Sequence, residues 1–246
     1  GKEIDATVLV YFTAETPITV GQIGEDAPRP MYDHLRKFGR QKRLALYLYS
    51  MGGVMETPWK MVSMLREFCE TFLVLVPYKA YSAATMIAIG ADKIYMTNKA
   101  ELGPIDPSLT AQVPSDREGP RLPDLGVEDI ASYLTFIRER AKLTDQEALA
   151  KVVVPLAEYL SPPLLGRLER VYSHIRLVAR NLLGLHTPPF DDRQISAIAE
   201  ALIEKIYVHG HGIGRKEAQQ IGLDIEHVNG DLAESMWLLY ENYEAA

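Results

Sequence analysis

The chain has one cysteine, Cys69, among its 246 residues. A single thiol can form neither an internal disulfide framework nor a cysteine-rich zinc site, so other interactions must hold the fold together. Basic residues are also few, with 26 lysines and arginines against 33 acidic residues and a net charge of −7. Because no basic excess is available to replace phosphate counterions, the composition argues against a nucleic-acid binder.

Long hydrophobic runs are missing as well. No apolar stretch reaches the length of about 18 residues that a membrane helix needs, and the N-terminus lacks a charged-then-apolar signal pattern. We therefore expect a cytoplasmic protein. Because the sequence begins with Gly1 rather than Met, membrane association through a segment outside this sequence is kept as an alternative.

The first 110 residues alternate between strand-like and helix-like segments. Apolar runs separated by helix-length segments indicate a parallel sheet covered on both faces. We expect an α/β core over residues 1–126 and a helical part over 127–246, packed on the core and in oligomer contacts. Strands are expected at 8–12, 44–50, 72–76 and 92–97, and helices at 31–38, 57–70, 82–90, 127–142, 145–159, 163–183, 192–206, 214–222 and 229–243.

Two strand-to-helix junctions carry residues that could take part in catalysis. The apolar run 71–77 ends shortly before Ser82, where a helix of small residues begins, and the strand 44–50 runs into Gly52 and Gly53. A hydroxyl at a helix N-terminus lies where unpaired N–H groups and the positive dipole end favour negative charge. Adjacent crossovers of a parallel sheet meet at one edge, so the sequence predicts a nucleophile beside an anion-holding backbone.

Each feature taken alone has a simpler explanation. A serine such as Ser82 is more often a helix N-cap than a nucleophile, and a Gly-Gly pair is more often a plain turn. The order and spacing of the two junctions together are what favour an active site. The pair His209 and His211 lacks a nearby third ligand, so no metal site is expected.

Four segments stand out together, namely LALYLYSMGG (44–53), VPYKAYSAATM (76–86), GADKIYM (90–96) and LGPIDP (102–107). Together they resemble the serine dehydrogenase proteinases, which are relatives of signal peptide peptidase SppA and of the ClpP protease. The similarity is densest over residues 44–109, with a weaker echo at 143–147 and 209–223. The resemblance implies a ClpP/crotonase-type spiral of parallel βαβ units with a helical C-terminal part. It also implies an ATP-independent serine peptidase without a cofactor, acting on peptides or proteins as a homo-oligomer.

The same resemblance implies roles for individual residues. Ser82 corresponds to the nucleophile, and the N–H groups of Gly53 and Ala83 correspond to the donors that hold the tetrahedral oxyanion. Both amides suit this role, because glycine allows close backbone approach and Ala83 opens a helix. We further expect Gly52, Tyr81 and Asp106 to contribute to substrate binding. For Asp106, capping of the proline turn is the competing explanation.

The general base is less well defined. Residues 103–107, where ClpP has its histidine, contain none, so a ClpP-type triad is not predicted. SppA-like relatives use a lysine farther downstream, and Lys142 is the first lysine after Lys99. Lys142 is therefore the candidate base, with Lys79 and His174 as further candidates. A lysine acts as a base only where desolvation lowers its pKa.

Two other functional classes stay open. A crotonase-like acyl-CoA enzyme would use the same backbone geometry to stabilise an enolate, with no need for a serine at the helix start. A non-catalytic scaffold would keep the fold without a competent base. A dehydrogenase is not expected, because no Gly-x-Gly-x-x-Gly motif follows a predicted strand.

Overall fold

A computed structural model of the protein describes residues 1–15, 21–105, 132–133, 136–143, 145–159, 162–204 and 211–245. The chain divides into two compact units, one made of residues 1–105 and 177–246 and the other of residues 106–176. Ser82 and the glycine turn belong to the first unit, and Lys142 belongs to the second. The boundary that we expect near residue 126 falls outside the described residues, and the two-part division there stays a prediction.

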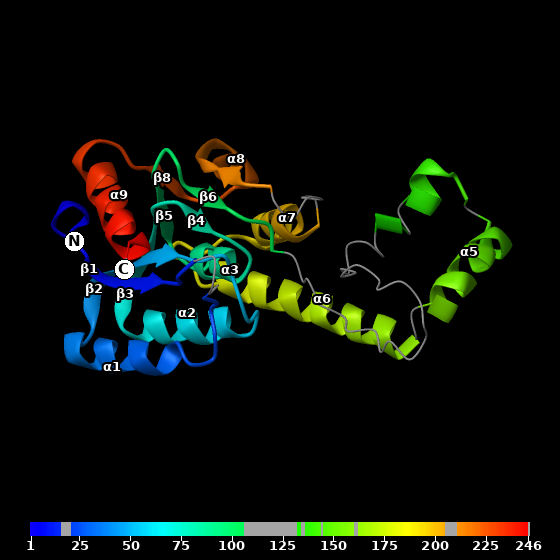
Figure 1. The fold of residues 1–246 in the computed structure, drawn as a ribbon, viewed down its shortest axis with the longest axis horizontal. Coiled ribbons are helices and arrows are strands. Elements are labelled where there is room, and N and C mark those ends of the chain that lie inside the picture. The colour runs from blue at the N-terminus through cyan, green and yellow to red at the C-terminus, as the bar shows by residue number, and fades with distance from the viewer. Residues whose placement is uncertain are drawn as a thin grey trace. The chain divides into compact units, whose positions relative to one another are not determined.

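A five-stranded sheet forms the centre of the first unit (Figure 1). All four strand pairs are parallel, so the expected α/β class with parallel βαβ units is confirmed. Leu9, Leu46, Val74 and Ile94 stand in one row across the sheet. In spatial order the strands are β1 (Thr7–Phe12), β2 (Gln41–Tyr49), β3 (Cys69–Val76), β5 (Lys93–Met96) and β8 (Ile225–His227).

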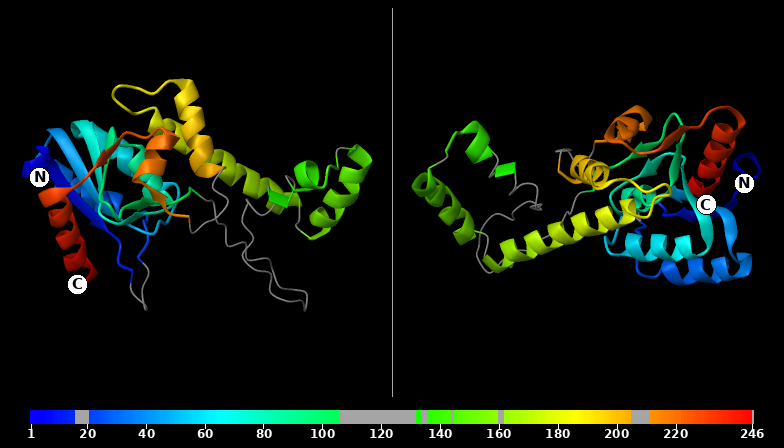
Figure 2. Two further views of the ribbon diagram at one scale, coloured as in Figure 1. Left: turned by 90° about the horizontal axis from the view of Figure 1, so that it is seen from above. Right: turned by 180° about the vertical axis from the view of Figure 1, so that it is seen from behind.

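Helices cover both faces of this sheet, because side chains of successive strand residues point to opposite faces. Tyr47 of β2 faces α9 (Gly230–Glu244) and donates a hydrogen bond to the Met236 carbonyl at 2.8 Å. The opposite face lies against α1 (Pro28–Phe38) and α2 (Thr57–Glu67). Figure 2 shows α1 and α2 side by side on one face of the sheet and α9 on the other.

A second, three-stranded sheet extends the carboxyl end of the first. Its strands are β4 (Lys79–Ala80), β6 (Glu101–Leu102) and β7 (Ile213–Gly214), with β4 and β6 parallel and β6 and β7 antiparallel. The helix α3 (Ala83–Ile89) follows β4, and all seven of its residues are buried. The other described helices of this unit are η1 (Lys2–Ile4), the end of α6 (Pro162–Leu183) from residue 177 onward, α7 (Asp192–Ile203) and α8 (Arg215–Ile221).

The structure differs from the sequence prediction at several element ends. Helix α2 is shorter than expected, because Cys69 starts β3 and pairs with Gln41 of β2 instead of ending a helix. Strand β8 was not predicted. Its three residues, Ile225-Glu-His227, are too few to show a strand period, and pairing with β5 makes them a strand.

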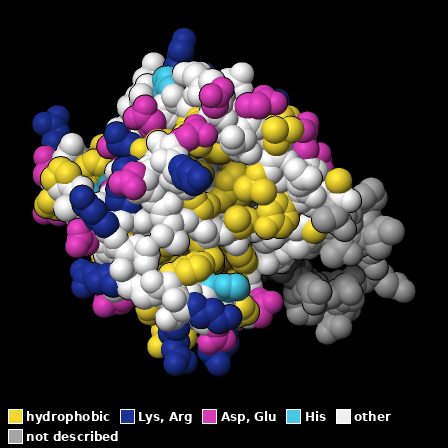
Figure 3. All heavy atoms as spheres, turned by 90° about the vertical axis from the view of Figure 1, so that its left-hand side faces the viewer, with side chains coloured by type: hydrophobic (Ala, Val, Ile, Leu, Met, Phe, Trp, Pro, Cys, Tyr) yellow, Lys and Arg dark blue, Asp and Glu magenta, His cyan; other side chains and the backbone are white. Residues whose placement is uncertain are grey.

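One edge of the main sheet is formed by β1, which within the described residues pairs only with β2. Its sequence, Thr7-Val-Leu-Val-Tyr-Phe12, carries no charged side chain. Figure 3 faces the side of the molecule on which β1 lies. Hydrophobic side chains gather in the middle of this face, and charged side chains stand around them.

Most of the described residues of the second unit are helical. They comprise η2 (Phe136–Arg140), a π-helical turn, then α5 (Gln146–Tyr159) and the first part of α6 (Pro162–Leu183). Helices were expected over all three stretches. Among the helices in the described ranges, none combines the length and apolarity that a bilayer crossing demands.

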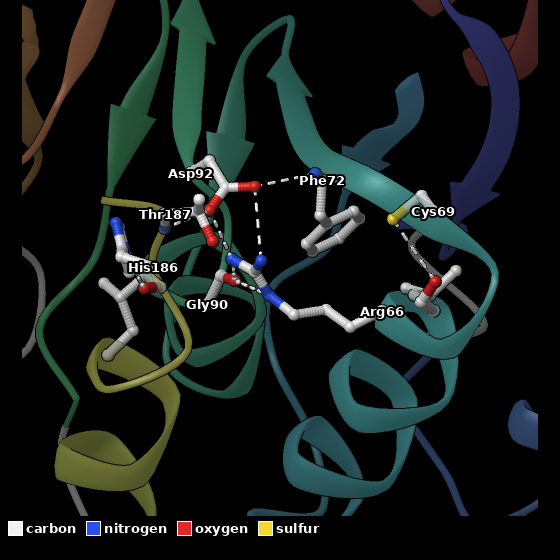
Figure 4. A network of polar contacts seen from close by, with 9 residues as sticks. Arg66, Cys69, Phe72, Gly90, Asp92, His186 and Thr187 are labelled. Carbon is white, nitrogen blue, oxygen red and sulfur yellow. Dashed lines mark hydrogen bonds and ion pairs between the residues drawn. The ribbon is translucent and has the colours of Figure 1, made fainter. Parts of the chain in front are cut away.

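A buried polar network fixes the end of α3 that lies away from Ser82 (Figure 4). The Arg66 guanidinium of α2 pairs with Asp92 at 2.9 Å and also donates to the Gly90 carbonyl at 2.8 Å. Asp92 accepts two further bonds, from the amides of Phe72 and Thr187, each at 2.8 Å. The Asp92 carboxylate thus binds α2, the start of β3 and the segment after α6, and Arg66 links the same network to the end of α3.

Candidate active site

Ser82 occupies a strained position between β4 and α3. Its backbone has φ 52° and ψ −115°, a left-handed region that serine rarely adopts. The side chain forms no capping hydrogen bond, so the hydroxyl is not used as an ordinary N-cap. Ser82 is half-buried, and its Oγ lies 3.5 Å from the Sδ of Met55. A thioether is a weak acceptor, so this contact leaves the hydroxyl largely available.

The sharp turn at Ser82 is held by the residues around it. The Thr85 Oγ1 lies 2.7 Å from the Ala80 carbonyl oxygen and 2.8 Å from that of Gly103, and it accepts the Gly103 N–H at 3.1 Å. A methyl group on Gly103 would come within 2.7 Å of the Tyr81 ring, so only glycine lets the two segments approach this closely. Thr85 therefore links α3 to β4 and to the end of β6.

The glycine turn lies directly against Ser82. A methyl group on Gly52 would lie 2.9 Å from the Ser82 Cβ and 3.3 Å from its Oγ, so a side chain at position 52 would displace the serine. Gly52 has φ 112° and Gly53 has φ 153°, conformations that favour glycine. The junctions expected to meet at one edge of the sheet are therefore in contact.

The backbone of the turn has a defined orientation. Ile23 donates its N–H to the Gly52 carbonyl and accepts the Val54 N–H, both at 2.8 Å, which makes a parallel bridge with Gly53. In such a bridge the groups of the central residue point away from the partner strand. Within the part of the chain that the structure describes, neither the Gly53 nor the Ala83 N–H donates a hydrogen bond. Both amides are available to a ligand.

Tyr81 stands immediately before Ser82. Its hydroxyl donates to Glu101 at 2.7 Å, and its ring packs on Gly103. Burial, assisted by the hydrogen bond to Glu101, raises the pKa of Tyr81. The phenol therefore stays neutral at physiological pH and acts as a hydrogen-bond donor.

The candidate bases lie in different units of the chain. Lys79 interacts with Glu15 at 3.9 Å and lies over the Tyr78 ring at 4.9 Å. Lys142 follows η2 in the second unit, where it is exposed and has φ 57°. His174 is also exposed in that unit. Among the described residues of the first unit, no imidazole, amine or carboxylate contacts the Ser82 hydroxyl.

The remaining predicted residues are Asp106 and the histidine pair His209 and His211. Asp106, expected to take part in substrate binding, lies outside the described residues, as does His209. His211 is described, and its Nε2 lies 2.9 Å from the Glu217 carboxylate. In the described ranges, no three histidine, cysteine, aspartate or glutamate side chains are grouped so as to hold a metal ion.

Sequence reasoning missed the polar residues that shape the turn. Ser50 and Thr13 are buried at the carboxyl ends of their strands, and Thr85 is buried inside α3. A polar residue at the carboxyl end of an apolar strand is a usable signal, because ligand sites of parallel sheets form there. Met55 carried no comparable signal.

Comparison with known proteins supports the resemblance. Residues 24–117 match the ClpP-like SDH-type serine proteinase family, and this stretch includes Gly52, Gly53 and Ser82. The uncharacterized protein MJ0137 of Methanocaldococcus jannaschii is 22% identical over 210 residues, 85% of this chain and 62% of that protein. MJ1495 of the same organism is 22% identical over 199 residues, 80% of this chain and 56% of that protein. The chain thus spans about three fifths of the length of the curated relatives it matches.

Solved structures show the same fold. A serine-to-alanine mutant of the 1510-N membrane-bound stomatin-specific protease has a TM-score of 0.50 at 17% identity, covering 94% of this chain and 84% of that one. A lysine-to-alanine mutant of that protease in complex with a substrate peptide has a TM-score of 0.50 at 15% identity, covering 92% and 76%. The predicted resemblance to SDH-type serine proteinases and the predicted ClpP-type α/β fold are confirmed, and the expected enzyme class agrees with the description of the matched family.

Proposed function

We propose that the protein is an ATP-independent serine peptidase with Ser82 as its nucleophile. Ser82 Oγ attacks the carbonyl carbon of a peptide bond and loses its proton to a base. The Gly53 and Ala83 amides donate hydrogen bonds to the oxyanion of the tetrahedral intermediate. The C–N bond then breaks as the base returns the proton to the leaving amine, and water hydrolyses the acyl-enzyme.

The observation that carries this proposal is the state of Ser82. Its hydroxyl makes no capping bond, its backbone is strained, and the backbone of Gly52 lies against it. Strained backbone of this kind persists where the surroundings impose it, commonly at functional sites. In the described part of the chain, two amides without a hydrogen-bond partner accompany a hydroxyl that is engaged only by the weakly accepting Met55 sulfur, and this arrangement suits acyl transfer better than a packing role.

Lys142 is our proposed base. A lysine becomes a base only when it is removed from water, and Lys142 is exposed within its own unit. We therefore propose that a second copy of the chain covers Lys142 when the homo-oligomer assembles. Gly52 and Tyr81 would form part of the substrate-binding wall, together with Asp106.

A homo-oligomer is part of the same proposal. The β1 edge carries no charge that would discourage strand pairing, and hydrophobic side chains gather on the face on which β1 lies (Figure 3). Light scattering over a range of protein concentrations tests the oligomer, and a monomer at all concentrations would contradict it.

A peptide substrate is supported by the structural neighbour that was solved with one.

The function is tested by labelling with a fluorophosphonate probe, followed by mass mapping of the modified residue. We expect the label on Ser82, no label in Ser82→Ala and slower labelling in Lys142→Ala. Lys151→Ala is the matched control, because Lys151 is also exposed in the second unit, where it pairs with Glu147. This control should label at the rate of the unmodified protein.

Two outcomes would overturn the proposal. A folded protein that takes no label would support a non-catalytic scaffold. A Ser82→Ala variant that keeps full turnover of an acyl-CoA thioester would support a crotonase-like enzyme. If Lys142→Ala labels as fast as Lys151→Ala, Lys142 is not the base.

A further inference from the structure

Ser50 joins the two junctions of the candidate site. It follows β2 directly and is fully buried, at 0% exposure. Its N–H donates to the Lys79 carbonyl at 3.1 Å, and its carbonyl accepts the Tyr81 N–H at 3.0 Å. The backbone of Ser50 therefore binds the segment that leads into Ser82.

The side chain of Ser50 binds the glycine turn at the same time. Its Oγ accepts the Gly52 N–H at 3.1 Å and the Thr13 hydroxyl at 2.9 Å, and it donates to the Gly52 carbonyl at 3.3 Å. A serine hydroxyl has one donor and two acceptor positions, and all three are occupied here. Thr13 is itself buried and anchored, since its N–H donates to the Tyr49 carbonyl at 3.0 Å.

This hydrogen-bonding pattern decides which amide of the turn is free. Gly52 is bound at both of its backbone groups, its N–H by Ser50 and its carbonyl by Ser50 and Ile23. Two successive glycines otherwise have wide conformational freedom, so the turn needs outside contacts to hold one shape. With Gly52 fixed, the Gly53 N–H is left without a partner among the described residues and points away from Ile23.

We propose that Ser50, oriented by the Thr13 hydroxyl, is a positioning residue that aims the Gly53 amide at the oxyanion. The inference rests on the proposed serine peptidase function. Among the described residues Ser50 forms no hydrogen bond with Ser82, so we take it to act through the Gly52 peptide. Ser50→Ala leaves the buried Gly52 N–H without its acceptor, so the turn can rotate to find another. Misplacing a catalytic group by about 1 Å can slow a reaction about 100-fold.

The test measures the rate constant with which a fluorophosphonate labels Ser82, and separately the final labelled fraction. We expect Ser50→Ala to label roughly 10- to 100-fold more slowly. Thr13→Val, which keeps the shape of the side chain but removes its hydroxyl, should also be slow, and Thr13→Ser should restore the rate. Ser63→Ala is the matched control, because in the described part of the chain the buried Ser63 Oγ has no hydrogen-bond partner. It should label as the unmodified protein does.

A merely structural role gives a different result. Irreversible misfolding would lower the final labelled fraction, and reversible partial unfolding would lower the melting temperature and slow labelling only in proportion to the folded fraction. In both cases the rate constant per folded molecule stays unchanged. That result, or equal rate constants in Ser50→Ala and Ser63→Ala, would overturn the positioning role. If Ser50→Ala does not fold, equal rate constants in Thr13→Val and Thr13→Ser would do the same. A label that persists in Ser82→Ala would instead refute the proposed function itself.

Discussion

Replacing Asp92 by alanine should lower the free energy of unfolding by about 3–5 kcal/mol, because it breaks a buried ion pair and leaves one charge unpaired. The Arg66 and Asp92 side chains are only 14% and 5% exposed, so water replaces little of the lost interaction. The Phe72 N–H would also lose its acceptor in the core. Arg66 keeps its bonds to the Gly90 carbonyl, which limits the loss.

Equilibrium unfolding in urea, followed by fluorescence, measures this change. With an m-value of about 2 kcal/mol/M, a loss of about 4 kcal/mol moves the midpoint down by roughly 2 M. Asp33→Ala is the matched control. Asp33 pairs with Arg29 on the surface, with side chains 47% and 71% exposed, and such pairs contribute about 0–1 kcal/mol.

Equal midpoint shifts in Asp92→Ala and Asp33→Ala would refute the predicted loss of stability. A second check uses the pair itself. In an Arg66→Met background, the additional change Asp92→Ala should cost at least about 1 kcal/mol less than it does alone, because contacting residues couple. Simple additivity would mean that the carboxylate is not stabilised chiefly by Arg66.

Two further predictions concern backbone space and pH. Gly53→Ala should reduce Ser82 labelling at least about 100-fold, since the new methyl group would overlap the Ile23 carbonyl and lie 2.5 Å from the Ile23 nitrogen. Gly214→Ala, with open space around the added carbon, should label normally, and equal rates in the two variants would contradict the prediction. Burial lowers the pKa of His186 from its ordinary 6.5, although its Nε2 bonds to the Ile89 carbonyl at 2.7 Å. Between about pH 6.5 and the lower pKa of the native state, the unfolded chain therefore binds a proton that the native state does not, so the free energy of unfolding should fall as pH is lowered through this window. His186→Gln should weaken this pH dependence in urea titrations, and an unchanged slope would refute the assignment.

Local pattern was enough to predict most of the first unit's α/β elements. The apolar runs at β1, β2, β3 and β5 stand out because buried parallel strands need hydrophobic side chains on both faces. The same pattern predicted that Ser82 and the glycine turn lie at one edge of the sheet. Their contact follows from topology alone, since crossovers of parallel strands bring successive carboxyl ends together.

Other features depend on contacts between residues far apart in the chain. Strand β8 exists because β5 offers it a pairing edge, and three residues carry no period of their own. The lack of a capping bond at the Ser82 hydroxyl, and the hydrogen bond from the Gly52 amide to Ser50, depend on which neighbours reach those atoms. Composition and hydrophobic period specify which segments are buried. Hydrogen-bond partners of single atoms are chosen by three-dimensional packing, because the chain brings donors and acceptors within about 3 Å only after it has folded.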